Sequence, residues 1–314
     1  MDYTGKFKIS IGVSATIIII GIVAGVFTGA LNVGVDFAGG ALFTIETHDP
    51  NFDMDVVNAA LESNGITDAQ VVRTGNTTSA QSMVNITMRS LNDDEAESAV
   101  RTDTLNAIKQ TYPRAAIITV DRVDGVASAG LVRNAILSVL AASVLILCYI
   151  WIRFELFSGL AAVLCLLHDV AIMFAFTCIL RVPINSPFIA AILTIVGYSI
   201  NNTIVVFDRI RENRKSDVHA DKHFDMIVNQ SVQATLGRSI NTSFTTLITI
   251  TMVYIFGVSS IKEFSLPIII GLLAGTYSSI FLAGPLWAKW LQARMIKAKG
   301  KTLQKGKKKA SAKK

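Results

Sequence analysis

The sequence predicts an α-helical membrane protein with six transmembrane helices and one α+β domain between the first two. Of its 314 residues, 51% are hydrophobic, and the mean hydropathy is +0.50, which a soluble domain of this length rarely reaches. Several runs of about 18 or more residues are nearly free of charge, so they are long enough to cross a bilayer. Residues 36–128 form the only long insertion, and within it residues 41–121 alternate strand and helix patterns.

Six apolar runs define the expected spans. The first, about Ile9–Val35, is longer than the apolar part of a signal peptide and ends in glycines rather than a cleavage site, so we expect it to be retained. The other five are expected at about Asn134–Ile152, Leu156–Leu180, Pro187–Phe207, Ser239–Gly257 and Phe264–Trp290. Short polar links, and a longer one from Asp208 to about Leu236, would connect them.

Charge is distributed as membrane topology predicts. Residues 36–128 carry 14 acidic against 6 basic residues, whereas the chain from Lys289 onward has 10 Lys, 1 Arg and no acid. Because basic residues favour the cytoplasmic side, we expect both termini in the cytoplasm and residues 36–128 outside. The predicted parts are therefore 1–35 (cytoplasmic start and first helix), 36–128 (external domain), 129–290 (five helices) and 291–314 (a solvated basic tail). We expect lipid contacts and no specific nucleic acid.

The inserted domain has the pattern of a ferredoxin-like βαββαβ fold. Its helices are expected at Met54–Ser63 and Asp93–Thr111, with a turn at residues 75–78. Its strands are expected at Ala41–Thr47, Gln70–Thr74, Ser82–Ser90 and Ala116–Asp121. Its acidic residues favour a solvated surface, and the alternative is a surface that touches an emerging polypeptide or a partner.

Enzyme signatures are missing from the sequence. No zinc motif, phosphate-binding loop or nucleophile elbow is present, so we expect no enzyme activity, no metal and no organic cofactor. The three cysteines, Cys148, Cys165 and Cys178, fall in apolar runs without metal-ligand spacing and are expected to act as small apolar fillers.

Polar residues inside the predicted spans are the candidate functional groups. Asn201 and Asn202 are consecutive amides in an apolar run, and Asn202 lies one helical turn after Tyr198. Amides at this depth need partners, so they either bond a neighbouring helix or belong to a site. Asp208 and Arg209 follow at the aqueous end of the same helix.

Two more groups lie in the third and fifth predicted spans. Asp169 follows His168 in the middle of an apolar run, where an ionisable pair is costly and predicts either a proton-linked carboxylate or a structural ion pair. Arg238, Asn241 and Thr242 share a helix face. Arg238 could extend to the interface or pair with a carboxylate of the bundle.

Four motifs occur in one order: GVDFAGG, HDV, GYSINNTIVVFDRIREN and TLGRS. The first contains Gly34, Asp36, Phe37, Gly39 and Gly40, and the third contains Gly197 and Tyr198. Together they resemble the SecF type of the SecD/SecF protein-export family, a six-helix half-unit of the RND superfamily. The resemblance implies a subunit of the bacterial plasma membrane that uses the ion-motive force, proton or sodium, to assist late-stage preprotein export. The implied partners are SecD, the SecY-E-G channel, a YajC-like accessory protein and the preprotein.

One residue departs from the family pattern. Where this chain has Asn202, the family has an aspartate taken to carry protons, while Arg238 matches the arginine of the same transfer site. Because an amide is not protonated near neutral pH, Asp169 or the partner could carry the proton instead. The coupling ion could also differ, this copy could be weakly coupled or uncoupled, or Asn202 could be an engineered change. The alternatives left open are an RND half-transporter for lipid or small molecules and an ion-uncoupled scaffold of the translocon.

Overall fold

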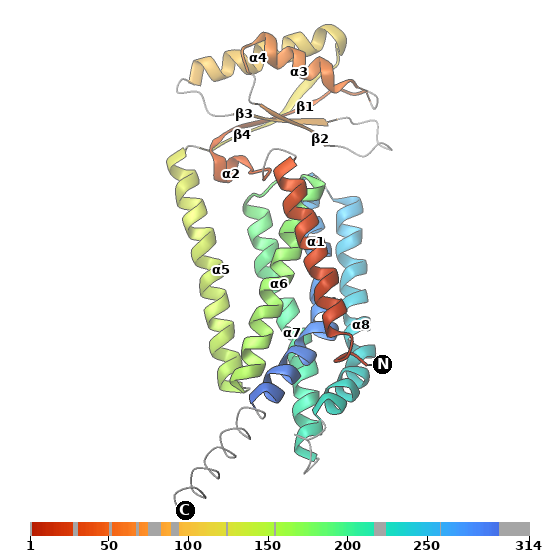
Figure 1. Cartoon of the computed structure of the whole chain (residues 1–314). Coiled ribbons are helices and arrows are strands. Elements are labelled where there is room, and N and C mark those ends of the chain that lie inside the picture. The colour runs from red at the N-terminus through yellow and green to blue at the C-terminus, as the bar shows by residue number, and fades with distance from the viewer. Residues whose placement is uncertain are drawn as a thin grey trace, which may run out of the picture.

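The computed structural model describes residues 2–27, 31–49, 52–66, 69–74, 83–88, 94–123, 125–153, 155–216, 224–257 and 259–294. A bundle of long helices carries a small α/β domain on one end (Figure 1). Six described helices are long and apolar enough to cross a membrane. They are α1 (Phe7–Phe27), α5 (Gly125–Arg153), α6 (Leu156–Leu180), α7 (Ser186–Ser216), α8 (Phe224–Phe256) and α9 (Ser259–Ser278). The last helix continues beyond Ser278 through a π-helical turn, η2 (Ser279–Ala283).

The six predicted spans are therefore present, but some boundaries were wrong. The first helix ends at Phe27, and the glycine-rich segment after it contains a short helix, α2 (Val35–Ala38). The connection expected from Asp208 to Leu236 is mostly helical, because α7 continues to Ser216 and α8 begins at Phe224. Buried apolar residues at helical spacing, such as Phe207 and Ile210, explain these extensions. Residues 217–223 and the basic tail beyond Arg294 lie outside the described residues.

The small domain has the predicted order of elements. Its strands are β1 (Gly40–Glu46), β2 (Gln70–Thr74), β3 (Met83–Met88) and β4 (Ala116–Val123), and its helices are α3 (Met54–Ser63) and α4 (Asp94–Thr111). The antiparallel sheet has the strand order β2-β3-β1-β4, with both helices on the face away from the bundle (Figure 1). The predicted turn at residues 75–78 lies outside the described residues.

Alternating residues of β1 and β3 form the core of this domain. Phe43, Ile45, Val84 and Ile86 are at most 1% exposed, as expected for strands with one face under helices. Strand β1 pairs with β3 on one side and with β4 on the other, so it is central to the sheet. Because β1 follows α2 directly, the centre of this sheet is attached to the top of the bundle.

Small residues allow the membrane helices to approach closely. A Cβ atom added at Gly21 of α1 would lie 2.4 Å from both Cα and Cβ of Ala175 on α6. A Cβ added at Gly275 of α9 would lie 3.0 Å from Cβ of Ser199 on α7. Close backbone approach is the usual basis of helix association in lipid, since lipid removes the hydrophobic drive between helices.

Replacing Gly21 by alanine is expected to separate α1 from α6. The added methyl group overlaps backbone atoms of Ala175, so the fold should lose roughly 1–3 kcal/mol of stability. The midpoint of thermal unfolding in detergent should fall. Gly12→Ala is the matched control on the same helix, because a Cβ there meets nothing within 4 Å. Equal midpoints for the two variants would contradict this packing.

Candidate functional site

Asp169 is the centre of a polar cluster inside the bundle. It is 0% exposed, and it is the one acidic residue near the middle of a described membrane-spanning helix. Two hydroxyls donate to its Oδ2: Ser199 Oγ of α7 at 2.5 Å and Ser278 Oγ of α9 at 2.9 Å. Its Oδ1 lies 2.9 Å from Nδ1 of His168. Three elements therefore meet at a single buried carboxyl group.

The cluster extends to α1 through the histidine. Nε2 of His168 lies 2.8 Å from Oγ of Ser14, a residue that is 5% exposed. The Nδ1–H tautomer lets His168 donate to an ionised Asp169 and accept from Ser14. If Asp169 gains a proton on Oδ1, it can donate to Nδ1 of the other tautomer, whose Nε2–H then donates to Ser14. The same positions thus accommodate both protonation states of Asp169 with their hydrogen bonds reversed.

Asn202 belongs to a second cluster, next to the first on the same helices. Its Nδ2 lies 3.4 Å from Oγ of Ser243 on α8, and the Tyr198 hydroxyl lies 3.4 Å from the same atom. Thr276 of α9 donates to Ser243 Oγ at 2.7 Å. Asn202 is 3% exposed. It therefore bonds a neighbouring helix, and its partner is a hydroxyl rather than a charged group.

The two clusters share α7 and α9. Ser199 and Asn202 are three residues apart on α7, and Thr276 and Ser278 are two residues apart on α9. Directly after Ser278, the helix changes to the π-helical turn η2. Such a turn interrupts the regular backbone ladder and is frequent at functional sites. A change in hydrogen bonding at either cluster therefore acts on the same pair of helices.

The predicted residues of α8 face outward. Arg238 and Asn241 are exposed and Thr242 is half-buried, so the predicted common face exists but points away from this bundle. Among the described residues, no carboxylate forms an ion pair with Arg238. Asn201 and Gly197 are exposed on α7 in the same way. The structure thus separates Asn202 from Asn201 and separates Arg238 from Asp169.

The other motif residues lie toward the two ends of the bundle. Asp36 accepts a hydrogen bond from the backbone N–H of Ser186 at 2.9 Å, and Phe37 packs partly buried against the bundle core. Gly39 and Gly40 have positive φ values of 70° and 139°, which explains why both are glycine. At the opposite end Arg209 donates to Glu212 at 2.7 Å, and Asp208 is exposed.

Sequence reasoning missed half of this site. The hydroxyl residues were not among the predicted site residues: Ser14, Ser199, Ser243, Thr276 and Ser278. The polar groups were expected mainly on the third, fourth and fifth spans. The first and sixth spans contribute as well. A serine in an apolar helix commonly bonds its own backbone, so its presence alone does not mark a site. Only the packing of α9 against α6, which brings Ser278 to Asp169, distinguishes Ser278 from other hydroxyls.

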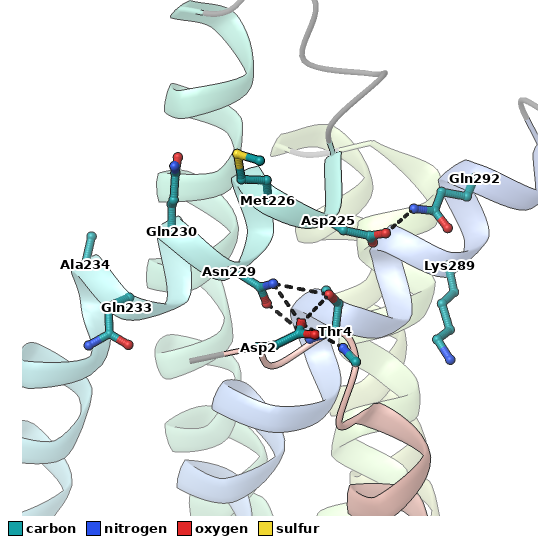
Figure 2. A pocket seen from close by; sticks show the side chains of 11 residues that line it. Asp2, Thr4, Asp225, Met226, Asn229, Gln230, Gln233, Ala234, Lys289 and Gln292 are labelled. Atoms are coloured by element: carbon teal, nitrogen blue, oxygen red, sulfur yellow. Dashed lines mark hydrogen bonds between the residues drawn. The ribbon is translucent and has the colours of Figure 1, made fainter.

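A second polar region lies at the bundle end opposite the sheet. A cavity of about 820 Å³ lies between the N-terminal segment, the start of α8 and the last helix. Figure 2 shows the side chains that line it. Asn229 Oδ1 accepts from the backbone N–H groups of Tyr3 and Thr4 at 2.9 and 3.1 Å, and its Nδ2 donates to Asp2 at 2.9 Å. Asp2 also accepts from the Gly5 N–H. Asn229 therefore ties the N-terminal segment to α8.

Comparison with known proteins gives consistent matches. Residues 103–293 match the family described as protein export membrane protein SecD/SecF, C-terminal. The SecF subunit of the Sebaldella termitidis protein translocase is 37% identical over 270 residues, covering 83% of this chain and 82% of that protein. The SecDF subunit of Bacillus subtilis is 37% identical, covering 92% of this chain and 38% of that protein. The crystal structure of SecDF from Thermus thermophilus, described as translocon-associated, has a TM-score of 0.78 at 32% identity, covering 92% of this chain and 38% of that one.

The fold and the buried cluster define a multi-pass membrane protein with a carboxylate at the centre of its helix bundle. The chain belongs to the SecD/SecF protein-export family, and the match to SecF proteins extends over most of its length. It spans about two-fifths of the SecDF chains that it resembles.

Replacing Asn229 by alanine is expected to release the N-terminal segment. Amide exchange at Tyr3 and Thr4 should rise roughly fivefold, because each lost hydrogen bond is worth about 1 kcal/mol. Gln230→Ala is the control, since this exposed neighbour lines the same cavity. Amide exchange is measured by mass spectrometry. Equal exchange rates in the two variants would show that Asn229 does not hold the N-terminal segment.

The same tether is expected to loosen in acid. The Gly5 N–H, then Asn229 and Thr4, hold the pKa of Asp2 below its ordinary value. A lowered pKa means that this contribution is present above the ordinary pKa and is lost as pH falls through the lowered one. Amide exchange at Gly5, corrected for its intrinsic pH dependence, should therefore rise only at the acidic end.

Proposed function

We propose that this protein is a subunit of the Sec protein-export machinery and uses an ion gradient to assist late-stage export of preproteins. The relatives named as translocase subunits support the export role. The observation that carries the use of a gradient is the fully buried Asp169, held by two hydroxyls and a histidine from three helices. A buried ionisable group inside a membrane bundle is costly, and this cost is commonly tolerated for ion transfer.

The location that we propose is the bacterial plasma membrane, with both termini in the cytoplasm and the small domain outside. The excess of basic residues in the chain after Lys289 favours this orientation. The order βαββαβ and the sheet order β2-β3-β1-β4 support a ferredoxin-like fold for the external domain. The six spans would then form one half-unit of an RND-type transporter.

The outward-facing polar residues of α7 and α8 favour a second helix bundle as partner. Thr194 and Asn201 are exposed on α7, and Arg238, Asn241 and Thr245 are exposed on α8. Polar groups on a membrane helix are rarely presented to lipid, so another protein should cover them. We propose that SecD covers this surface, beside the SecY-E-G channel and a YajC-like accessory protein. The SecDF relatives, in which a single chain is much longer than this one, support this choice.

The coupling ion that we propose is the proton, with Asp169 as its carrier in this chain. Asp169 has hydrogen-bond partners in either protonation state, so it can take up a proton without leaving a buried polar atom unpaired. Asn202 cannot carry a proton near neutral pH, and it acts as a neighbouring hydrogen-bond donor. Loss of coupling at Asn202 would instead favour the uncoupled scaffold, and the first experiment below distinguishes the two.

Replacing Asp169 by asparagine is expected to remove the part of preprotein export that depends on an imposed pH gradient. The amide keeps the shape of the carboxyl group but cannot exchange a proton. Export is measured in vesicles that contain this chain, SecD and the channel, with and without a proton or sodium gradient. Asp121→Asn, on an exposed strand of the small domain, is the control.

The same vesicles test the alternative. If the unmodified chain shows no response to either gradient but Asn202→Asp gains one, Asn202 is a loss at the coupling site and the protein is an uncoupled scaffold. If the response is present and survives Asp169→Asn, the carrier belongs to the partner.

Replacing Arg238 by alanine is expected to impair export without lowering the amount of protein in the membrane. Arg238 has no carboxylate partner among the described residues, so its charge would act on the proposed partner. Arg238→Lys should retain part of the activity, since it keeps the charge. Ile248→Ala, also exposed on α8, is the control. Normal export by Arg238→Ala at equal abundance would exclude this role.

A further inference from the structure

The segment after α1 forms a joint with the segment before α7. Residues Val33 and Ile184 pair as a parallel bridge, with Gly34 N donating to Ile184 O at 2.9 Å and Ile184 N donating to Asn32 O at 2.7 Å. The Asn32 side chain donates to the carbonyl of Arg181 at 2.7 Å. We call residues 32–36 and 181–186 the outer joint. It connects two segments that are about 150 residues apart in the chain, as the separation between Asp36 and Ser186 shows.

The outer joint holds the first turn of α7. Oδ2 of Asp36 accepts from the backbone N–H of Ser186, the first residue of α7, and Oδ1 of Asn185 accepts from the N–H of Phe188 at 3.1 Å. These side chains satisfy donors that a helix start leaves open. A Cβ at Gly34 would lie 3.0 Å from the Asn185 side chain, so glycine permits this close approach.

The same joint also reaches α9. Nδ2 of Asn185 donates to Oε2 of Glu263 at 2.7 Å, and Glu263 lies in the first turns of α9. On its other side, the joint leads through α2 and the positive-φ residues Gly39 and Gly40 into β1. The central strand of the small domain is therefore linked to the outer ends of both α7 and α9 by side chains of three residues, Asp36, Asn185 and Glu263.

These are the two helices whose hydroxyls hold Asp169. Ser199 lies 13 residues after Ser186 on α7, and Ser278 lies 15 residues after Glu263 on α9, so each hydroxyl is roughly 20 Å below the joint at 1.5 Å per residue. Addition of a proton to Asp169 removes its negative charge and so weakens the hydrogen bonds that the two hydroxyls donate to it. A resulting shift of α7 or α9 along its axis would move the outer joint, and the joint would then displace β1.

We propose that the outer joint transmits the protonation of Asp169 to the external domain, with Asp36 and Asn185 as positioning residues. This inference rests on the proposed function, because it assumes that the ion gradient drives the protein. Asp36 touches no reacting group, and it acts by fixing the first residue of α7 to the segment that enters the sheet.

Asp36→Ala removes the acceptor for Ser186, whereas Asp36→Asn keeps one oxygen in place and is the conservative variant. Asp121→Ala, at an exposed position of β4 in the small domain, is the control for loss of an acidic residue. A pair of spin labels reports the domain position: one at Glu62, exposed on α3, and one at Phe256, exposed at the outer end of α8. The three native cysteines are replaced first, in a background shown to export normally.

In vesicles with SecD and the channel, the gradient should change the distance between the labels in the unmodified protein. Asp36→Ala should abolish this change and lower the gradient-dependent increment of export roughly fivefold or more, with export in the absence of a gradient unaffected. Asp36→Asn and Asp121→Ala should behave as the unmodified protein. If Asp36→Ala does not accumulate, Glu263→Ala tests the same joint through α9 alone and should give the same loss.

The outcomes separate the two proposals. If the unmodified protein responds to the gradient and Asp36→Ala responds equally, the joint is overturned and the proposed function stands. If neither export nor the label distance responds to the gradient in the unmodified protein, the proposed function is wrong. The proposed role of the joint is then wrong as well, because there is no response for it to transmit. If Asp36→Ala and Asp36→Asn lose export equally, the charge of Asp36 matters rather than its bond to Ser186, which also overturns the inference.

Discussion

A single buried carboxylate determines how this bundle is assembled. Asp169 has no exposed surface, so its oxygens must be satisfied from within the protein. The donors come from α7, α9 and, through His168, α1. For those hydroxyls to arrive, the helices must approach closely, and the small residues Gly21 and Gly275 lie where they do so. The close packing of the helices and the hydrogen bonds to Asp169 therefore depend on each other.

The polar residues of the membrane helices fall into an inner and an outer set. Ser199, Asn202 and Ser243 face inward, where Ser199 bonds Asp169 and Asn202 bonds Ser243. Asn201, Arg238 and Asn241 face outward on the same helices. A helix whose polar residues point in two directions is placed between two protein surfaces. This division supports a complex in which the described bundle is covered by another on the side of α7 and α8.

The glycine-rich motif has a more specific role than a turn out of the membrane. Gly34 permits contact with Asn185, Gly39 and Gly40 adopt the left-handed region, and Asp36 caps α7. The motif therefore attaches the central strand of the small domain to the helix that carries Ser199 and Asn202. One short segment therefore connects the sheet to a helix of the intramembrane cluster.

The sequence was enough to predict the six spans, the βαββαβ order and the position of Asp169 in the middle of an apolar helix, because hydropathy and periodicity are local properties of the chain. It also determined that Tyr198 and Asn202 share a helix face, since 3.6 residues per turn fixes that relation. The packing of the helices was needed to show that Ser278 and Ser14 complete the cluster and that Arg238 faces away from it. The physical reason is that a hydroxyl or a guanidinium on a helix acquires its partner from the rotation and height of neighbouring helices, which many distant contacts set together.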